Sequence, residues 1–278
     1  MNTLSVIGLG SMGSAVAGRL VRGGAQVLTS LVGRSPESCA RAKAENITEA
    51  SDEDILGSDY ILSIVPPAEA YAVAQYWANK IAPSHLKPVY IDCNAISSKL
   101  TLKIAEIFKS IGVRYIDAGI IGGPGTHHTA GPNVYFSGEE PSDIEKIKQY
   151  GLQVLTANGP IGAASALKMT YAGLNKGIVG LAAAMILQAS QHGSEKALLS
   201  ELEHSQPQLL ALFKKSLPQM YSKAWRWEFE MQQIAEFSKD NAHIASLYES
   251  MGGFYAELGI DWTKSKALSS LIDDFFKA

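Results

Sequence analysis

The first half of the chain alternates between short apolar runs and longer stretches whose apolar residues recur at helical spacing. The apolar runs predict buried strands, and the amphipathic stretches predict helices. We predict strands at 4–7, 26–32, 59–65, 88–92, 113–118 and 133–136, helices at 11–22, 69–81 and 97–110, a helix beginning at 36, and a helix–strand pair over 141–155. This alternation is typical of an α/β domain with a doubly wound parallel sheet and helices on both faces.

The pattern changes near residue 159, after which no further strand pattern follows. One long helix is predicted over 163–192, because its apolar residues recur at helical spacing. Further helices are predicted over 194–205, 206–215, 220–238, 241–258 and 265–276. We therefore expect an α/β domain, 1–158, followed by an all-α C-terminal domain, 159–278.

The composition disfavours several classes of protein. Of the 278 residues, 46% are hydrophobic, and the net charge of -3 provides no basic surface for nucleic acid or an anionic membrane. The long helix carries Lys168, Asn175 and Lys176, which disfavours a membrane span. No basic stretch precedes the first apolar run, so we expect no signal peptide and a cytoplasmic protein. Cys39 and Cys93 lack metal-ligand spacing, and no metal site is predicted.

The sequence Gly8-Leu9-Gly10-Ser11-Met12-Gly13 directly follows the first apolar run. Gly8 permits a tight turn, Gly10 lets a pyrophosphate approach the backbone, and Gly13 lets the next helix pack close to the strand. The N–H groups and the positive end of the helix dipole complete a phosphate site. We therefore predict a Rossmann domain that binds a dinucleotide through these residues.

The end of the second strand determines which dinucleotide such a domain binds, since an acidic residue there accepts hydrogen bonds from the adenosine ribose. No Asp or Glu lies between Ala25 and Pro36, and the segment ends in Arg34-Ser35. A guanidinium and a hydroxyl suit a 2′-phosphate, so NADP is predicted over NAD. The alternative is that Arg34 is a solvated loop residue.

Other loops follow strand ends at the same edge of the sheet, where ligands bind in α/β folds. Val65 and Pro66 end the third predicted strand and Asn94 follows the fourth, so these residues are predicted to contact the cofactor. Asn94 would bond the ribose or the carboxamide, or else close its own turn. Gly122 and Gly123 follow the next strand at this edge.

Three stretches of the chain, 8–13, 117–123 and 159–168, resemble the β-hydroxyacid dehydrogenase superfamily, which includes 6-phosphogluconate and 3-hydroxyisobutyrate dehydrogenases. They are similar to the glycine-rich opening of the family, to its substrate-binding element, and to the start of its catalytic helix. The resemblance implies a Rossmann domain followed by a helical domain, and a substrate bound at 121–123.

The resemblance also implies that Lys168 donates a proton to a carbonyl oxygen as hydride arrives from the nicotinamide, and removes it in the reverse reaction. Lys168 lies about one and a half turns into a helix of small and apolar residues. A lysine buried there would exchange protons near neutral pH, as a general acid and base must. The alternative is a lysine that extends past its neighbours to solvent.

The catalytic helix departs from the family pattern at one position. Ala172 stands where the family has an asparagine. Tyr171 and Asn175 lie on the same helix face as Lys168, and either is predicted to replace the missing amide.

A second departure concerns the substrate, because Ile121 stands where the family has a carboxylate-binding serine. A substrate carboxylate would then rely on the backbone N–H groups of Gly122 and Gly123. This favours an uncharged carbonyl or imine over a simple 3-hydroxy acid. His127 and His128 follow in the same element; His127 is a predicted substrate contact, and solvated loop histidines are the alternative.

These features predict an NADP-dependent dehydrogenase or reductase that transfers hydride between the nicotinamide and a small carbonyl or alcohol, with Lys168 as general acid and base. An imine reductase and a catalytically inactive NADP-binding sensor or scaffold are the alternatives. Arg226 is the single arginine of the second half, which disfavours a phosphorylated sugar. The apolar helical half and its long helix with small residues predict a homodimer through the helical domain.

Overall fold

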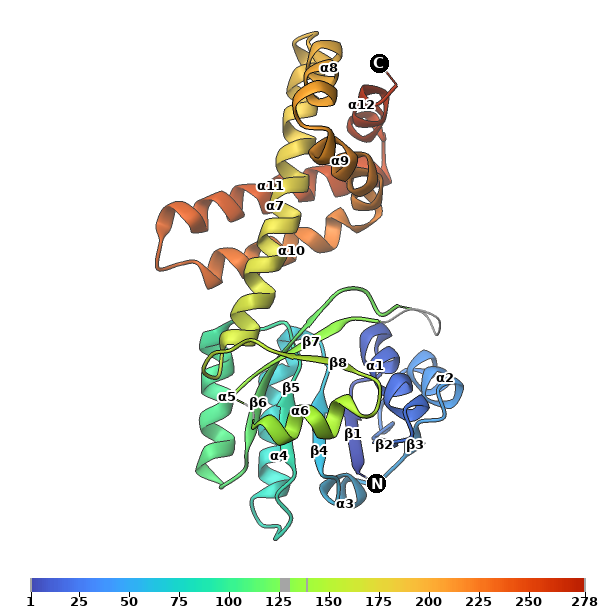
Figure 1. Cartoon of the computed structure of the whole chain (residues 1–278), viewed down its shortest axis with the longest axis vertical. Coiled ribbons are helices and arrows are strands. Elements are labelled where there is room, and N and C mark those ends of the chain that lie inside the picture. The colour runs from blue at the N-terminus through green and yellow to red at the C-terminus, as the bar shows by residue number, and fades with distance from the viewer. Residues whose placement is uncertain (1, 126–130, 139, 278) are drawn as a thin grey trace. The chain divides into compact units, whose positions relative to one another are not determined.

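The computed structural model describes residues 2–125, 131–138 and 140–277 (Figure 1). The chain forms two compact units, Met1–Lys168 and Met169–Ala278. The division lies inside the long helix α7 (Ala163–Gln191), whereas the boundary predicted at 158/159 lies in the turn before it. Lys168 therefore belongs to the first unit.

An eight-stranded sheet forms the centre of the first unit, in the order β3-β2-β1-β4-β5-β6-β7-β8. Its strands are β1 (Thr3–Ile7), β2 (Gln26–Thr29), β3 (Thr48–Glu49), β4 (Tyr60–Ser63), β5 (Val89–Asp92), β6 (Tyr115–Ile121), β7 (Asn133–Ser137) and β8 (Gln153–Thr156). Neighbouring strands are parallel except β6 and β7, which are antiparallel. The predicted α/β class with a Rossmann sheet is confirmed.

Helices cover both faces of this sheet (Figure 1). They are α1 (Ser11–Arg22), α2 (Pro36–Ala44), α3 (Asp52–Leu56), α4 (Ala70–Ile81), α5 (Ser98–Ser110) and α6 (Pro141–Lys148), with a 3₁₀ turn, η1, at Pro67–Glu69. Side chains of α1, α2 and α6 join one buried cluster, and those of α3, α4 and α5 join a second. Adjacent strand residues enter opposite clusters, as Ile61 and Leu62 do, because successive side chains of a strand point to opposite faces.

Several details of the predicted sheet need correction. β2 ends at Thr29 rather than at 32. β3 and α3 were not predicted, because elements of two and five residues are too short to show a period. β7 runs antiparallel to β6, since the described part of their connection contains no helix, and a parallel neighbour needs a crossover connection.

The second unit is entirely helical in its described residues, as predicted. It contains the greater part of α7, then α8 (Glu195–Ser205), α9 (Pro207–Met220), a 3₁₀ turn, η2, at Tyr221–Lys223, α10 (Ala224–Phe237), α11 (Ala242–Thr263) and α12 (Ala267–Phe275). One buried cluster joins α7, α9, α10, α11 and α12. The Tyr255 hydroxyl donates to the Lys176 carbonyl at 2.6 Å, and the Lys176 ammonium pairs with Glu230 at 2.7 Å. These contacts hold α10 and α11 to the middle of α7.

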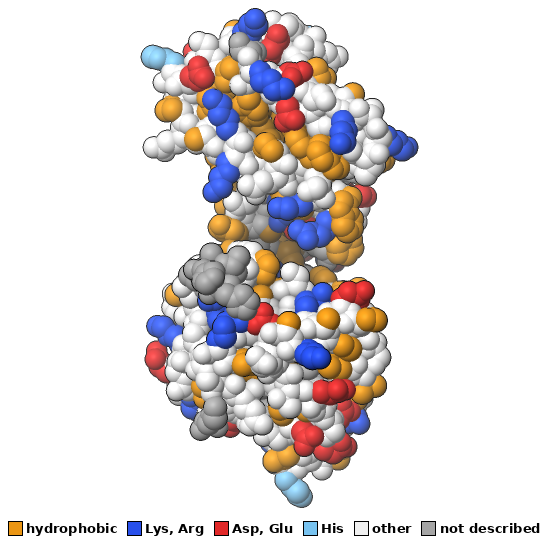
Figure 2. Space-filling model, turned by 90° about the vertical axis from the view of Figure 1, so that its right-hand side faces the viewer, with side chains coloured by type: hydrophobic (Ala, Val, Ile, Leu, Met, Phe, Trp, Pro, Cys, Tyr) orange, Lys and Arg blue, Asp and Glu red, His pale blue; other side chains and the backbone are white. Residues whose placement is uncertain are grey.

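Among the residues that the structure describes, α7 is the one helix whose length and mean hydropathy would suffice to span a membrane. The same test is passed by core helices, and Val179, Ala183 and Ile186 of α7 are indeed buried within the helical unit. Other hydrophobic side chains gather on the surface of this unit (Figure 2).

A buried carboxylate ties α6 to the amino ends of the strands. Asp143 accepts hydrogen bonds from the Tyr60 hydroxyl at 2.9 Å, from Arg114 Nη2 at 2.6 Å and from the Glu140 N–H at 3.2 Å. Burial tends to raise the pKa of Asp143, but the hydrogen bonds from Arg114 and Tyr60 outweigh it and hold this pKa below its usual value. Tyr60 begins β4 and Arg114 directly precedes β6. This cluster therefore lies at the amino ends of these strands, opposite the edge formed by their carboxyl ends.

Candidate active site

The glycine-rich turn joins β1 to α1 and leaves an open space in front of the helix. Gly8 has φ +95°, and a Cβ there would overlap the Ile64 carbonyl oxygen. A Cβ at Gly13 would overlap the carbonyl oxygen of Gly8, so the helix could not pack as closely with any other residue. A Cβ at Gly10 would meet no described atom within 4 Å. The turn thus has the shape that a dinucleotide pyrophosphate requires.

The first turn of α1 is open to an anion. Its N-cap residue, Gly10, makes no side-chain hydrogen bond, and its first turn contains no acidic residue. The Ser14 N–H donates to the Gly10 carbonyl at 2.9 Å. The N–H groups of Ser11, Met12 and Gly13 have no carbonyl of their own helix to bond, because the first N–H groups of a helix lack a partner within it. Leu9, in the turn before them, is buried.

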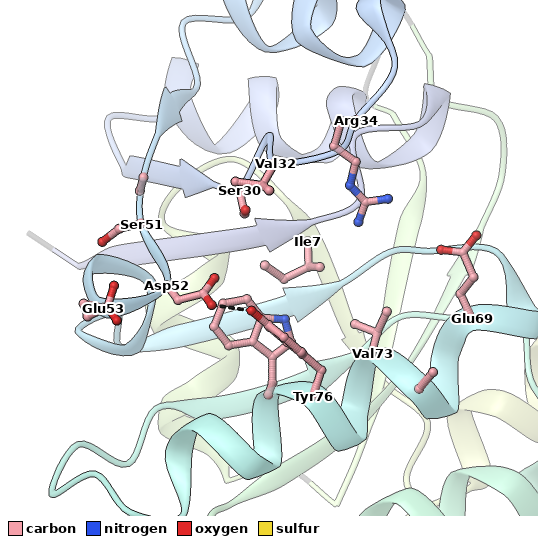
Figure 3. A pocket seen from close by; sticks show the side chains of 13 residues that line it. Ile7, Ser30, Val32, Arg34, Ser51, Asp52, Glu53, Glu69, Val73 and Tyr76 are labelled. Carbon is pink, nitrogen blue, oxygen red and sulfur yellow. Dashed lines mark hydrogen bonds between the residues drawn. The ribbon is translucent and has the colours of Figure 1, made fainter.

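A cavity of about 640 Å³ adjoins this turn, between the end of β2 and α4 (Figure 3). Arg34 enters it from the loop after β2, and the segment from Thr29 to Arg34 contains no acidic residue. The acidic lining residues come from other elements: Asp52, Glu53 and Glu69. The cavity can contain an adenosine, with Arg34 beside it.

The acidic residue Asp52 in this cavity is already engaged. It accepts a hydrogen bond from the Tyr76 hydroxyl and pairs with the Lys80 ammonium at 3.0 Å. Figure 3 shows the guanidinium of Arg34 and the carboxylate of Glu69 both directed into the cavity, from opposite sides.

Arg41 on α2 is a neighbour of the glycine turn that the sequence analysis missed. Its Nε donates to the Leu9 carbonyl at 2.8 Å, and its Nη2 donates to Ser38 Oγ at 3.1 Å. Ser35 caps α2 by accepting from the Ser38 N–H at 3.3 Å, so its hydroxyl is engaged within the helix start. The cue was its place about one and a half turns into α2, since a long arginine side chain there can reach back to the turn.

Asn94 joins the ends of β4 and β5. Its Oδ1 accepts from the Val65 N–H at 2.7 Å, and its Nδ2 donates to Ser63 Oγ at 3.1 Å. The side chain is buried, and these bonds fix Val65 against Gly8. Asn94 thus shapes the loop that ends in the exposed Pro66. A contact of Asn94, Val65 or Pro66 with the cofactor stays a prediction.

Lys168, on α7, lies next to Gly119 of β6. A Cβ on Gly119 would lie 2.6 Å from the Ala164 carbonyl oxygen and 3.4 Å from Lys168 Cβ, so α7 rests on the strand where a side chain is missing. Lys168 is half-buried. Burial raises the pKa of the Cys93 thiol, and Asp92 raises it further, whereas the positive charge of Lys168 lowers it. Lys168 therefore also lies near the end of β5.

The predicted substrate residues lie at the end of β6. Ile121 is its last residue and is half-buried, and Gly122 follows with φ +115°, a conformation that favours glycine. A Cβ on Gly123 would meet no atom of the described residues within 4 Å. His127 and His128 lie outside the described residues.

Two residues of β7 were missed by the sequence analysis. Tyr135 pairs with Gly119, and Asn133 pairs with Ile121. Directly paired residues share a face of the sheet, and the Gly119 face is the one on which Lys168 lies. Tyr135 and Asn133 are both half-buried on this face. Their alternation with buried apolar residues along the strand was the signal that could have identified them.

Tyr171 and Asn175 belong to the helical unit, on the turns of α7 that follow Lys168. Both are exposed, and the Asn175 Nδ2 donates to the Tyr171 carbonyl at 2.8 Å. Their participation in catalysis stays a prediction. Among the described residues, no three His, Cys, Asp or Glu side chains are grouped to hold a metal ion.

Comparison with known families identifies the family of the first unit. A family model described as the NAD binding domain of 6-phosphogluconate dehydrogenase matches residues 3–163. The chain belongs to this family. It is a pyridine-nucleotide-dependent oxidoreductase. A second model, described as a domain of unknown function, matches residues 189–258 of the oxidoreductase.

The proteins that this oxidoreductase resembles are named for several different activities. The NAD-dependent L-serine dehydrogenase of Pseudomonas aeruginosa is 26% identical over 266 residues, which cover 93% of this chain and 82% of that protein. The structure of Mycobacterium tuberculosis 3-hydroxyisobutyrate dehydrogenase with L-serine matches with a TM-score of 0.77 at 17% identity, over 100% of both chains. An imine reductase from Myxococcus stipitatus with NAD+ matches with a TM-score of 0.59 at 15% identity, over 99% of both chains. At these identities the two structures show a common fold.

The resemblance drawn from the sequence and the dinucleotide-binding domain are therefore confirmed. The preference for NADP, the catalytic part of Lys168 and the individual contacts with cofactor and substrate stay predictions.

The behaviour of Asp92, at the end of β5, can be tested directly. Its Oδ1 accepts from the Asn94 N–H at 3.0 Å, and its Oδ2 has no hydrogen-bond partner within the described part of the chain. Burial raises the pKa of Asp92 to about 6, and the neighbouring Asp117 contributes to this rise. The carboxyl group is thus protonated more readily in the folded state than in the unfolded chain.

We expect Asp92→Asn to stabilise the protein at about pH 8 by up to about 3 kcal/mol, since each unit of pKa corresponds to about 1.4 kcal/mol. Because the pKa of Asp92 is higher in the folded state, the wild-type protein loses stability as the pH rises from about 4 to about 6. The stability difference between Asp92→Asn and wild type should therefore disappear below about pH 4. Urea unfolding at several pH values measures this. A difference that stays constant between these limits would contradict the assignment.

Proposed function

We propose that this oxidoreductase uses NADP and transfers hydride between nicotinamide C4 and a small carbonyl or alcohol, with Lys168 as general acid and base. The observation that carries the proposal is the position of Lys168 above Gly119. Gly119 lies on the strand that leads into Gly122, which packs against Pro132, and into Gly123, where a Cβ would meet no described atom within 4 Å. The glycine turn and the adenosine-sized cavity lie at the carboxyl edge of the same sheet.

Different residues bind the cofactor, transfer the proton and bind the substrate in this proposal. The N–H groups at the start of α1 bind the pyrophosphate, and the cavity that Arg34 lines holds the adenosine. The bound nicotinamide supplies or accepts the hydride. Lys168 donates a proton to the substrate oxygen during reduction and removes it during oxidation. Gly122 and Gly123 offer backbone N–H groups to the polar end of the substrate.

The choice of NADP rests on Arg34. No acidic residue of the segment after β2 competes for the ribose hydroxyls, and a guanidinium binds phosphate through charged hydrogen bonds. The named relative from Pseudomonas aeruginosa is NAD-dependent, so the proposal separates this chain from it.

Arg34→Ala should weaken NADPH binding by about 10-fold to 100-fold, since a charged hydrogen bond contributes about 1.5–3 kcal/mol, and should leave NADH binding unchanged. Fluorescence titration with both cofactors tests this. Arg41→Ala is the matched variant, because Arg41 supports the glycine turn and its loss should weaken both cofactors alike. Wild-type protein that binds NADH as tightly as NADPH would refute the preference.

The substrate is proposed to be a small carbonyl compound without a carboxylate at the reacting end. Ile121 replaces the carboxylate-binding serine of the family, and its paired neighbour, Asn133, offers an uncharged amide. An imine reductase is the second candidate, since the same features suit a C=N group and imine reductases share the fold.

Lys168→Ala should lower kcat for ketone reduction by about 100-fold to 10,000-fold, the usual contribution of a general acid, with unchanged affinity for NADPH. The measurement is NADPH oxidation with one panel of ketones and one of cyclic imines. Lys103→Ala, which changes an exposed lysine of α5, serves as the control.

Each other outcome of this assay selects a different function. Turnover restricted to imines that survives Lys168→Ala identifies an imine reductase, because an iminium substrate already carries its proton. Binding of NADPH without turnover of any compound would contradict both proposals and leave a cofactor-binding sensor or scaffold.

We also propose that two copies associate through α7. Five apolar side chains of this helix recur at spacings of three and four residues and are 39–63% exposed: Tyr171, Leu174, Ile178, Leu181 and Met185. A continuous apolar stripe of this kind is typical of a helix that packs against another helix. A second copy would present the same stripe, which a two-fold interface requires.

Light scattering at micromolar concentration should therefore give the mass of a dimer. Leu174→Glu combined with Leu181→Glu should give a monomer, because two charges would have to be buried. Glu substitution of the exposed Leu86, outside the stripe, is the control. A monomeric wild type would eliminate this interface.

A further inference from the structure

The start of α7 is held by a carboxylate of the sheet. Asp117 lies on β6 and is 1% exposed. Its Oδ2 accepts hydrogen bonds from the backbone N–H groups of Gly162 and Ser165, both at 3.0 Å, and from the Ser137 hydroxyl at 2.8 Å. Its Oδ1 accepts from the Ser165 hydroxyl at 2.5 Å. Each of these donors is a neutral group.

Neighbouring hydroxyls extend this contact to two further elements. Ser137, on β7, also accepts from the Ala164 N–H at 3.1 Å. Ser165 Oγ lies 3.0 Å from Thr101 Oγ1 of α5, and Ser98 donates to the Gly162 carbonyl at 3.0 Å. The first turn of α7 is therefore bonded to β6, β7 and α5 at once.

A negative charge is favourable at this point because the first N–H groups of a helix have no partner within the helix and carry its positive dipole end. A buried carboxylate without hydrogen bonds would be strongly unfavourable. Asp117 and the α7 N-terminus thus satisfy each other, and the direction of the helix is fixed where it leaves the sheet.

Lys168 follows this anchored turn immediately. It comes one helical turn after Ser165, and its Cβ lies 3.4 Å from the position that a Gly119 Cβ would occupy. Gly119 is two residues after Asp117 on the same strand, so both lie on the same face of β6. A shift of the α7 start would move Lys168 relative to the sheet edge.

We propose that Asp117 is a positioning residue for Lys168, which it holds over β6 through Gly162 and Ser165. The inference rests on the proposed function of Lys168 and assigns Asp117 no contact with substrate or cofactor. Removal of the Asp117 carboxylate should lower kcat and leave cofactor binding intact.

Asp117→Ala is expected to reduce kcat by about 100-fold, as a misplacement of a catalytic group by about 1 Å does, with an unchanged KM for NADPH. Asp117→Asn should stay within about 5-fold of wild type, because its amide oxygen can accept from the Gly162 and Ser165 N–H groups as Oδ2 does. Asp143→Ala is the matched control, since Asp143 is another buried, hydrogen-bonded carboxylate of this unit but lies at the opposite edge of the sheet.

Equal losses of kcat in Asp117→Ala and Asp143→Ala would show a general structural effect and overturn the proposal. Unchanged kcat in Asp117→Ala would also overturn it. If Asp117→Ala does not fold, Ser165→Ala replaces it, because that variant removes one bond to the carboxylate. Ser165→Ala should lower kcat by about 10-fold, and a kcat equal to wild type would refute the inference.

A second readout separates this inference from the proposed function. Lysines are labelled by reductive methylation with ¹³C, and the NMR signal of Lys168 is assigned by its absence in Lys168→Ala. This signal should shift in Asp117→Ala and stay in place in Asp143→Ala. An unshifted signal in Asp117→Ala overturns the inference, even if no compound is turned over and the proposed function has failed.

Discussion

The first unit of this oxidoreductase depends on the buried carboxylate of Asp117. It accepts three hydrogen bonds from the start of α7 and a fourth from the Ser137 hydroxyl of β7, all from neutral donors, at the point where the chain leaves the sheet. A carboxylate at this depth is stable only because the helix start needs an acceptor there. The strand, the helix and Lys168 are therefore fixed relative to one another by one interaction.

Among the helices that start near the carboxyl edge of the sheet, α1 and α7 differ in how their first turns are satisfied. α1 begins at Gly10 without a side-chain cap, whereas the first N–H groups of α7 donate to Asp117 and Ser137. In both cases a glycine permits close packing on the strand, Gly13 for α1 and Gly119 for α7. The first turn of α1 is thus without a side-chain acceptor, whereas the start of α7 has its own.

The sequence was sufficient for the α/β and all-α halves, the glycine turn and the family, because these depend on local periods and on glycines at fixed spacing. It did not reveal the parts that depend on strand pairing. Asp117 begins the stretch 117–123 that resembles the substrate-binding element of the family, yet its partners Ser137 and Ser165 lie 20 and 48 residues away. Tyr135 was missed for the same reason, since only the antiparallel register brings it beside Gly119.

Ile121 and Ala172 are the two departures from the family pattern, and both bear on the proposed substrate rather than on the pyridine-nucleotide chemistry of the family. The most direct measurement uses NADPH carrying deuterium at C4 in a single turnover with the ketone and imine panels, followed by mass spectrometry of the products. We predict one deuterium on the carbon that was the carbonyl or imine carbon. Tight binding of the labelled NADPH without deuterium in any product would contradict the account.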